Sequence, residues 1–142
     1  YWHRKSEEYI ISDLMHIIFH WFHDYAFSKH GSRYQPLLEK LRGDIYAHPE
    51  YDWTLEMMAE RINLSPRSLQ KVYKNFANIS CISEVIESRM IRAKMLLVRS
   101  DFDVGEISMQ CGYRNVEHFC RQFKKHEGCS PSHYRKEHLV QP

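Results

Sequence analysis

The chain has 142 residues, of which 43% are apolar and 27% are charged, and its formal net charge is +2. This length suits one domain, or one domain with an attached element, and the apolar content is enough for a core. No signal peptide and no run of about 18 apolar residues is present, which argues against a secreted or membrane-spanning protein. The four cysteines are scattered without a CxxC pair, so we expect reduced thiols in a cytosolic protein. Because the chain begins at Tyr1 rather than at methionine, we expect it to be a piece of a longer protein.

The first predicted element is a helix from Ser6 to Phe27, whose apolar residues recur at helical spacing. It is too apolar to stand alone in water, so it either belongs to an upstream domain or folds back onto the rest of the chain. His16 and His20 have the spacing of metal ligands on a helix, but a polar, solvent-facing side is favoured and we predict no metal site. A second helix is expected from Tyr34 to Tyr46, ended by His48-Pro49.

Two further stretches follow the same plan of a short helix, a tight turn and a second, basic helix. They span about 54–78 and about 104–128. In the second copy Gly112 and Gly128 can adopt the left-handed conformation that such turns need, and the first copy has Asn63 and Asn78 at these positions. The predicted helix caps are Thr54, Ser65, Asn115 and Ser130.

The internal repeat extends to the core positions. Leu55, Met58, Ala59, Ile62 and Leu64 fall in register with Val104, Ile107, Ser108, Cys111 and Tyr113. After one extra residue in the second copy, Leu69, Tyr73 and Lys74 match Phe119, Phe123 and Lys124. A repeat that keeps its turns, its core and its basic helix is hard to obtain by chance.

Between the copies, Ile82 to Val98 is predicted to be one long helix. Arg89 falls on its apolar side, and a buried guanidinium must be paired or it costs several kcal/mol. We favour a structural ion pair over a DNA contact, and the candidate partners are Asp101, Asp103 and Glu106.

Positive charge gathers on the second helix of each copy. The first has Arg67, Lys71 and Lys74 without an acid, and the second has Arg121, Lys124 and Lys125 together with Glu117. A charged helix face is usually just solvated, but the recurrence on equivalent helices favours phosphate contact. The predicted phosphate-binding residues are the two N-caps Ser65 and Asn115, with the amides behind them, and Lys74, Lys124 and Lys125.

The segments LEMMAERINLSPRSLQKVYK, ESRMIRAKMLL, VGEISMQCGY, HFCRQFKKHEG and SPSHYR together resemble the DNA-binding domain of the AraC/XylS family of bacterial transcription regulators. The resemblance covers about Tyr34 to Lys136. Four positions depart from the family pattern: Tyr73 replaces the usual Phe, Asn78 the usual Gly, and Cys81 and Glu84 stand where aromatic residues are typical.

The resemblance implies an all-α fold of two helix-turn-helix subdomains joined by a long linker helix and preceded by an extra N-terminal amphipathic helix. Residues 1–32 would be the end of a sensing or dimerisation domain or a linker, and residues 33–142 the DNA-binding domain. Within it, the linker helix spans about 82–98 and the final helix about 131–138. The two recognition helices are expected to enter successive major grooves, about 34 Å apart.

The family's base-contacting positions correspond here to Arg67, Gln70 and Lys71 in the first copy and to Glu117, His118, Cys120 and Arg121 in the second. Arg and Lys suit guanine, Gln suits adenine, and Glu can accept from cytosine. For Arg121 the alternative is a salt bridge with Glu117 at the rim.

The resemblance further implies a cytoplasmic, nucleoid-associated bacterial regulator that binds double-stranded DNA and is more often an activator than a repressor. Its expected partners are RNA polymerase, a second copy through the N-terminal segment, and a small-molecule effector if an upstream sensing domain exists. No cofactor, membrane contact or enzymatic activity is expected.

Three other functions are alternatives. Some DNA-repair alkyltransferases carry a similar domain beside zinc-bound cysteines, but this sequence lacks such a cysteine cluster. A redox or metal sensor could use Cys120 and the histidines. A protein-interaction domain without affinity for DNA could keep the repeat for packing alone.

Overall fold

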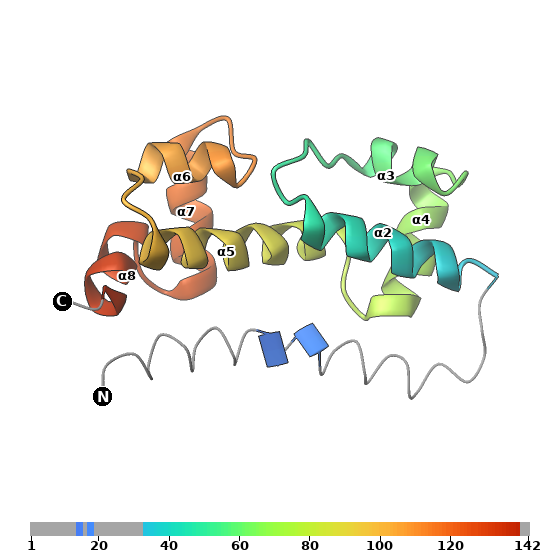
Figure 1. Ribbon diagram of the computed structural model, residues 1–142. Coiled ribbons are helices and arrows are strands. Elements are labelled where there is room, and N and C mark those ends of the chain that lie inside the picture. Colours follow the sequence, from blue (N-terminus) through green and yellow to red (C-terminus); the bar gives the residue numbers. More distant parts are fainter. Residues whose placement is uncertain (1–13, 16, 19–32, 140–142) are drawn as a thin grey trace. The chain divides into compact units, whose positions relative to one another are not determined.

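The computed structural model describes residues 14–15, 17–18 and 33–139. The regular secondary structure of these residues consists of helices alone (Figure 1). The predicted all-α class is therefore confirmed. The helices are α2 (Gln35–Ala47), α3 (Leu55–Arg61), α4 (Pro66–Ala77), α5 (Cys81–Arg99), α6 (Val104–Gln110), α7 (Val116–Glu127) and α8 (Pro131–His138). No helix among the described residues is both long enough and apolar enough to cross a membrane.

The helices form two compact units that divide within α5, between Ser88 and Arg89. We call residues 33–88 the first unit and residues 89–139 the second unit. In the first unit α4 packs against both α2 and α3. The fully buried core residues there include Leu38, Ile45, Met58, Leu69, Tyr73, Ala77 and Cys81. The predicted inward residues of the first copy therefore do form a core.

In the second unit α7 packs against α6 and α8. Four aromatic rings form a continuous series. The ring centroids are 5.3 Å apart for Tyr113 and Phe119, and 5.8 Å apart for Phe119 and Phe123. Phe123 and Tyr134 meet edge to face, with centroids 5.6 Å apart. Arg135 in α8 donates to the carbonyl oxygens of Leu97 and Phe102 at 3.0 and 2.6 Å. These bonds tie the last helix to the end of α5 and to the loop after it.

The predicted helix ends are confirmed. Thr54, Ser65, Asn115 and Ser130 each accept a hydrogen bond from a backbone amide three residues later. The four turn residues are left-handed, with φ of 53° at Asn63, 59° at Asn78 and 81° at both Gly112 and Gly128. Asparagine therefore performs the turns of the first copy that glycine performs in the second.

The final helix has its predicted bounds, Pro131–His138, and two other predicted helices differ from the structure by one residue at each end. The helix predicted from Tyr34 begins at Gln35 and continues to Ala47, and the linker helix is one residue longer at each end, Cys81–Arg99. The predicted N-terminal helix from Ser6 to Phe27 lies largely outside the described residues, as do His16 and His20.

Substitution by alanine should change the free energy of unfolding in opposite directions at two glycines. A Cβ at Gly43, inside α2, or at Gly128, after α7, would meet no atom within 4 Å. Neither substitution therefore causes a steric clash with a neighbouring residue. Gly43→Ala should raise the free energy of unfolding by about 0.5–1 kcal/mol, because alanine favours the helix interior. Gly128→Ala should lower it by about 1–2 kcal/mol, because φ there is 81°. Urea unfolding measures both; a shared sign would contradict the prediction.

Candidate nucleic-acid interface

The first candidate recognition helix, α4, buries one side and exposes the other. Leu69, Tyr73 and Ala77 are buried, whereas the three predicted base-contacting residues Arg67, Gln70 and Lys71 are exposed. The side chains of these three make no hydrogen bond or ion pair with a described residue. Donor groups on one helix face, held by a packed opposite face, are what major-groove readout requires.

The second candidate recognition helix, α7, repeats this arrangement. Phe119 and Phe123 are fully buried, and Glu117, His118 and Arg121 are exposed. Arg121 makes no ion pair with Glu117 or with any other residue that the structure describes. The rim salt bridge that was the alternative for Arg121 is thus not formed within residues 33–139.

Two of the predicted base-contacting residues of α7, His118 and Cys120, are more constrained than Arg121. The ring of the exposed His118 forms a T-shaped contact with the ring of Tyr113, with the ring centroids 5.6 Å apart. Cys120 is only partly exposed, and burial raises the pKa of its thiol above the usual value. A neutral thiol is a weak hydrogen-bond donor, so Cys120 is suited mainly to apolar contact with a base.

Among the predicted phosphate-binding residues, the caps already use their side-chain oxygens. Ser65 Oγ accepts from the amide of Ser68 at 3.2 Å, and Asn115 Oδ1 accepts from the amide of His118 at 2.9 Å. Lys74 Nζ donates to the carbonyl oxygen of Asn78 at 2.7 Å. In contrast, Lys124 and Lys125 are exposed and make no such bond with described residues.

The predicted pairing of Arg89 with Asp101, Asp103 or Glu106 requires a correction, because none of these three acids forms an ion pair with it among the described residues. Asp103 Oδ1 accepts from the amide of Glu106, and Glu106 Oε2 accepts from the amide of Asp103, both at 2.8 Å. This reciprocal pair is a capping box that begins α6, and the D-x-x-E spacing in the sequence is its signal.

Arg89 instead lies against an aromatic ring. Its guanidinium carbon is 5.1 Å from the ring centroid of Tyr113. Burial raises the pKa of Tyr113 to about 12, and the nearby Arg89 charge partly offsets this rise. The preferred structural role of Arg89 therefore gains support, with a cation–π contact inside the second unit.

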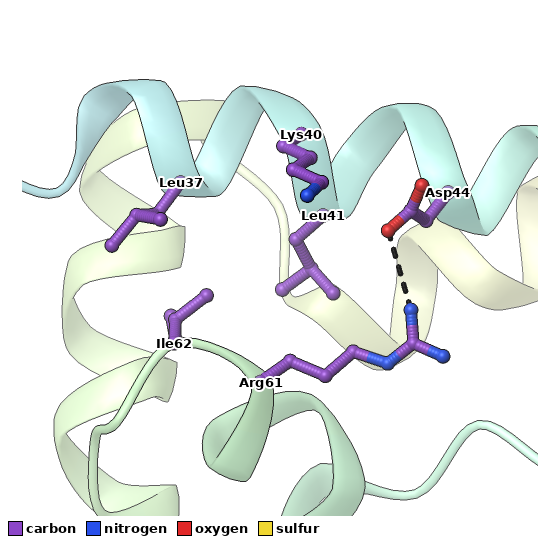
Figure 2. Close-up of a pocket in the computed structure, with 6 residues that line it drawn as sticks. All are labelled: Leu37, Lys40, Leu41, Asp44, Arg61 and Ile62. Atoms are coloured by element: carbon purple, nitrogen blue, oxygen red, sulfur yellow. Dashed lines mark hydrogen bonds and ion pairs between the residues drawn. The ribbon is translucent and has the colours of Figure 1, made fainter.

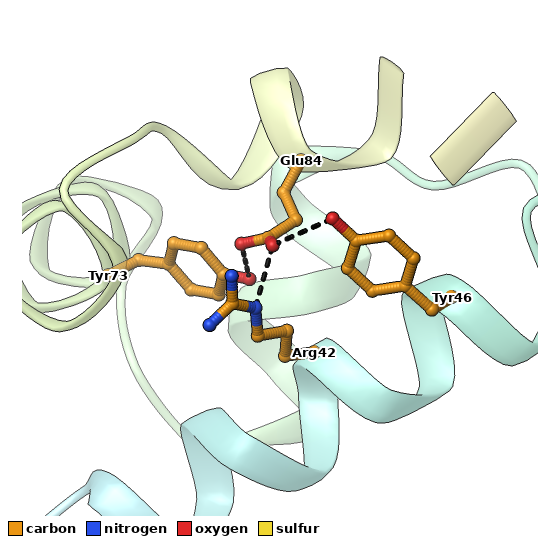
Figure 3. Close-up of polar contacts among 4 residues, drawn as sticks. All are labelled: Arg42, Tyr46, Tyr73 and Glu84. Carbon is orange, nitrogen blue, oxygen red and sulfur yellow. Dashed lines mark hydrogen bonds and ion pairs between the residues drawn. The ribbon is translucent and has the colours of Figure 1, made fainter. Parts of the chain in front are cut away.

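A buried polar cluster in the first unit was not anticipated from the sequence. Glu84, fully buried near the start of α5, accepts hydrogen bonds from Arg42 Nε at 2.7 Å, Tyr46 Oη at 3.1 Å and Tyr73 Oη at 2.6 Å (Figure 3). Burial and the Glu84 charge raise the pKa of both tyrosines, so both stay neutral donors. The signal in the sequence was the pair of family departures at Tyr73 and Glu84.

A half-open pocket of about 240 Å³ lies between α2 and the end of α3 (Figure 2). Leu37, Leu41 and Ile62 line it, and an ion pair of 3.2 Å between Arg61 and Asp44 closes one side. The Arg61 guanidinium also lies 4.8 Å from the ring of Trp53. This pocket is smaller than the roughly 300 Å³ at which ligand sites usually begin.

A family model described as a helix-turn-helix domain matches residues 58–137, which is more than half of the chain. Curated relatives of this chain are described as HTH-type transcription regulators, and the solved structures with a similar fold include an AraC-type regulator from Chromobacterium violaceum. The chain belongs to the AraC family of helix-turn-helix regulators. The match begins within the first copy of the helix-turn-helix and covers the whole of the second copy.

Two curated relatives illustrate the extent of the match. An uncharacterized HTH-type transcriptional regulator of Escherichia coli, YdiP, is 38% identical over 84 residues, and the regulatory protein PocR of Salmonella typhimurium is 31% identical over 93 residues. The match covers 59% and 66% of this AraC-type domain but only 28% and 31% of the relatives. The chain therefore spans about a third of the length of these proteins.

Solved structures match over a larger share of both this chain and their own chains. The C-terminal domain of AraT, a response regulator from Geobacillus stearothermophilus, is 34% identical with a TM-score of 0.72, over 78% of this chain and 92% of that one. The DNA-binding domain of AdpA, solved with a target DNA, is 25% identical with a TM-score of 0.68. This match covers 70% of this chain and 90% of that one. This AraC-type domain therefore shares its fold with one that has been seen on DNA.

Proposed function

We propose that this chain is the sequence-specific, double-stranded DNA-binding part of a bacterial transcription regulator. The observation that carries the proposal is the repeated recognition helix: α4 and α7 both bury an apolar side and expose cations on the other. Each would enter one major groove, and the two grooves would be successive, about one helical turn or 34 Å apart.

The contacts divide by chemistry. Exposed side chains near the helix starts would meet base edges, with Arg67, Lys71 and Arg121 directed to guanine and Gln70 to adenine. Glu117 would accept from cytosine, and His118 and Cys120 would contact neighbouring bases. Phosphates would be bound by Lys124 and Lys125, by Lys74 once it releases Asn78, and by the backbone amides beside the caps Ser65 and Asn115.

The larger regulator would act in the bacterial cytoplasm as an activator that contacts RNA polymerase. Residues 1–32 would link this domain to an upstream part that dimerises or binds a small-molecule effector. Family membership and the share of the relatives' length that this chain spans support these proposals.

Selection of duplexes from a random pool at two salt concentrations tests the DNA-binding proposal. We expect two short conserved elements about one helical turn apart, and binding that weakens steeply with salt because phosphate contact releases counterions. Weak binding without a selected sequence and without salt dependence would contradict it, and would favour a protein-interaction domain.

Arg121→Ala should relax the selected sequence at one element only. Arg121 is exposed on α7 and makes no ion pair with described residues, so its loss should not disturb the fold. We expect a loss of about 1–3 kcal/mol of discrimination at a single base pair. Lys125→Ala is the matched comparison: it should weaken binding to all sequences about equally and reduce the salt slope by about one. Equal effects of both changes at every base position would contradict this assignment.

A further inference from the structure

The Glu84 carboxylate connects three helices of the first unit. It comes from α5, accepts from Arg42 and Tyr46 of α2 through Oε1, and accepts from Tyr73 of α4 through Oε2 (Figure 3). Its side chain is 0% exposed and that of Arg42 is 3% exposed, so the ion pair is shielded from water. Buried polar groups that are fully bonded are rigid, because any movement leaves a group unsatisfied.

Tyr73 is the member of this cluster that belongs to the candidate recognition helix. Its ring lies on the buried side of α4 together with Leu69 and Ala77. Apolar packing is non-directional, whereas a hydrogen bond to a fixed carboxylate oxygen constrains both distance and angle. Since successive residues of a helix are about 100° apart, fixing Tyr73 also fixes the directions of the exposed Gln70 and Lys71.

In the second unit the recognition helix contacts the following helix at the same repeat positions, but through aromatic rings and not through a hydrogen bond. Phe123 of α7 stands where Tyr73 stands, and Tyr134 of α8 stands where Glu84 stands. These two rings meet edge to face, with centroids 5.6 Å apart and planes at 82°. At these two positions the first unit thus has a hydrogen bond where the second unit has an aromatic contact.

We infer that Glu84 is a positioning residue for DNA recognition, which sets the rotation of α4 through Tyr73 and so directs Arg67, Gln70 and Lys71 to their base edges. The inference rests on the proposed DNA-binding function. Neither Glu84 nor Tyr73 would touch DNA, because both side chains are fully buried. A rotation of α4 would withdraw the Tyr73 hydroxyl from Oε2 and leave that oxygen buried without its donor, so the cluster selects a single setting of the helix.

Two substitutions that each remove one tyrosine hydroxyl distinguish a role of Glu84 in positioning α4 from a role in stability alone. Tyr73→Phe removes the hydrogen bond that reaches α4, whereas Tyr46→Phe removes one to the same carboxylate from α2 and leaves α4 attached. The selected sequence is determined for each variant well below its unfolding temperature, and the element contacted by α4 is identified beforehand with Gln70→Ala. We expect Tyr73→Phe to reduce base discrimination at that element about tenfold and to leave the other element unchanged.

Tyr46→Phe and Tyr73→Phe should lower the unfolding temperature by similar amounts, because each removes one hydrogen bond to Glu84. Tyr46→Phe should nevertheless change base discrimination at neither DNA element by more than about twofold. The inference is overturned if Tyr73→Phe keeps the wild-type preference at the α4 element, or if Tyr46→Phe alters it equally. Failure of the DNA-binding proposal itself is distinguishable, because the unmodified chain would then select no sequence at all.

Discussion

Glu84→Ala should lower the free energy of unfolding by about 3–5 kcal/mol, because it leaves the Arg42 guanidinium buried without its carboxylate. The two groups are 2.7 Å apart and their side chains are 3% and 0% exposed, so the ion pair is shielded from solvent. The hydroxyl groups of Tyr46 and Tyr73 lose their acceptor in the same change. Chemical denaturation followed by circular dichroism measures the loss.

Glu60→Ala is the matched control, since Glu60 is an exposed glutamate on α3 of the same unit. Surface substitutions of this kind stay within about 0.5 kcal/mol. Replacing Arg42 and Glu84 together by methionine and leucine should recover part of the loss, because an apolar pair carries no desolvation cost. A cost below 1 kcal/mol for Glu84→Ala would show that the cluster is not the buried network described above.

Phe123→Ala should be about equally damaging to the second unit. Phe123 is 0% exposed and contacts the rings of both Phe119 and Tyr134. Removal of a buried phenyl ring costs about 3–5 kcal/mol through lost transfer free energy and the cavity that is left. Because Phe123 holds α7 against α8, we also expect the DNA element contacted by α7 to lose its sequence preference.

Phe102→Ala provides the comparison within the same unit. Phe102 is 40% exposed, and its described hydrogen bond to Arg135 uses the backbone carbonyl oxygen, which the substitution keeps. We expect a change within about 0.5 kcal/mol and an unaltered selected sequence. Similar losses for the two phenylalanines would contradict the assignment of Phe123 to the core.

The sequence predicted the local structure well because each signal was short-range. A cap such as Ser65 bonds an amide three residues away, and a left-handed residue such as Asn78 acts at its own position. The capping box of Asp103 and Glu106 is equally local and has the D-x-x-E spacing as its signal, although both acids are predicted from the sequence as partners of Arg89. The exposed positions of α4 and α7 followed from helical periodicity and the repeat.

By itself, the sequence determined the helices, their ends, the repeat and the family, since all of these depend on residues a few positions apart or on matching spacings. Only the tertiary structure decided the partners of the buried charges. Arg42 and Glu84 are 42 residues apart, and no local pattern places a guanidinium beside a carboxylate across that separation. Because a buried charge costs free energy unless it is paired, the packing of α2, α4 and α5 dictates that pairing, and with it how α4 is held.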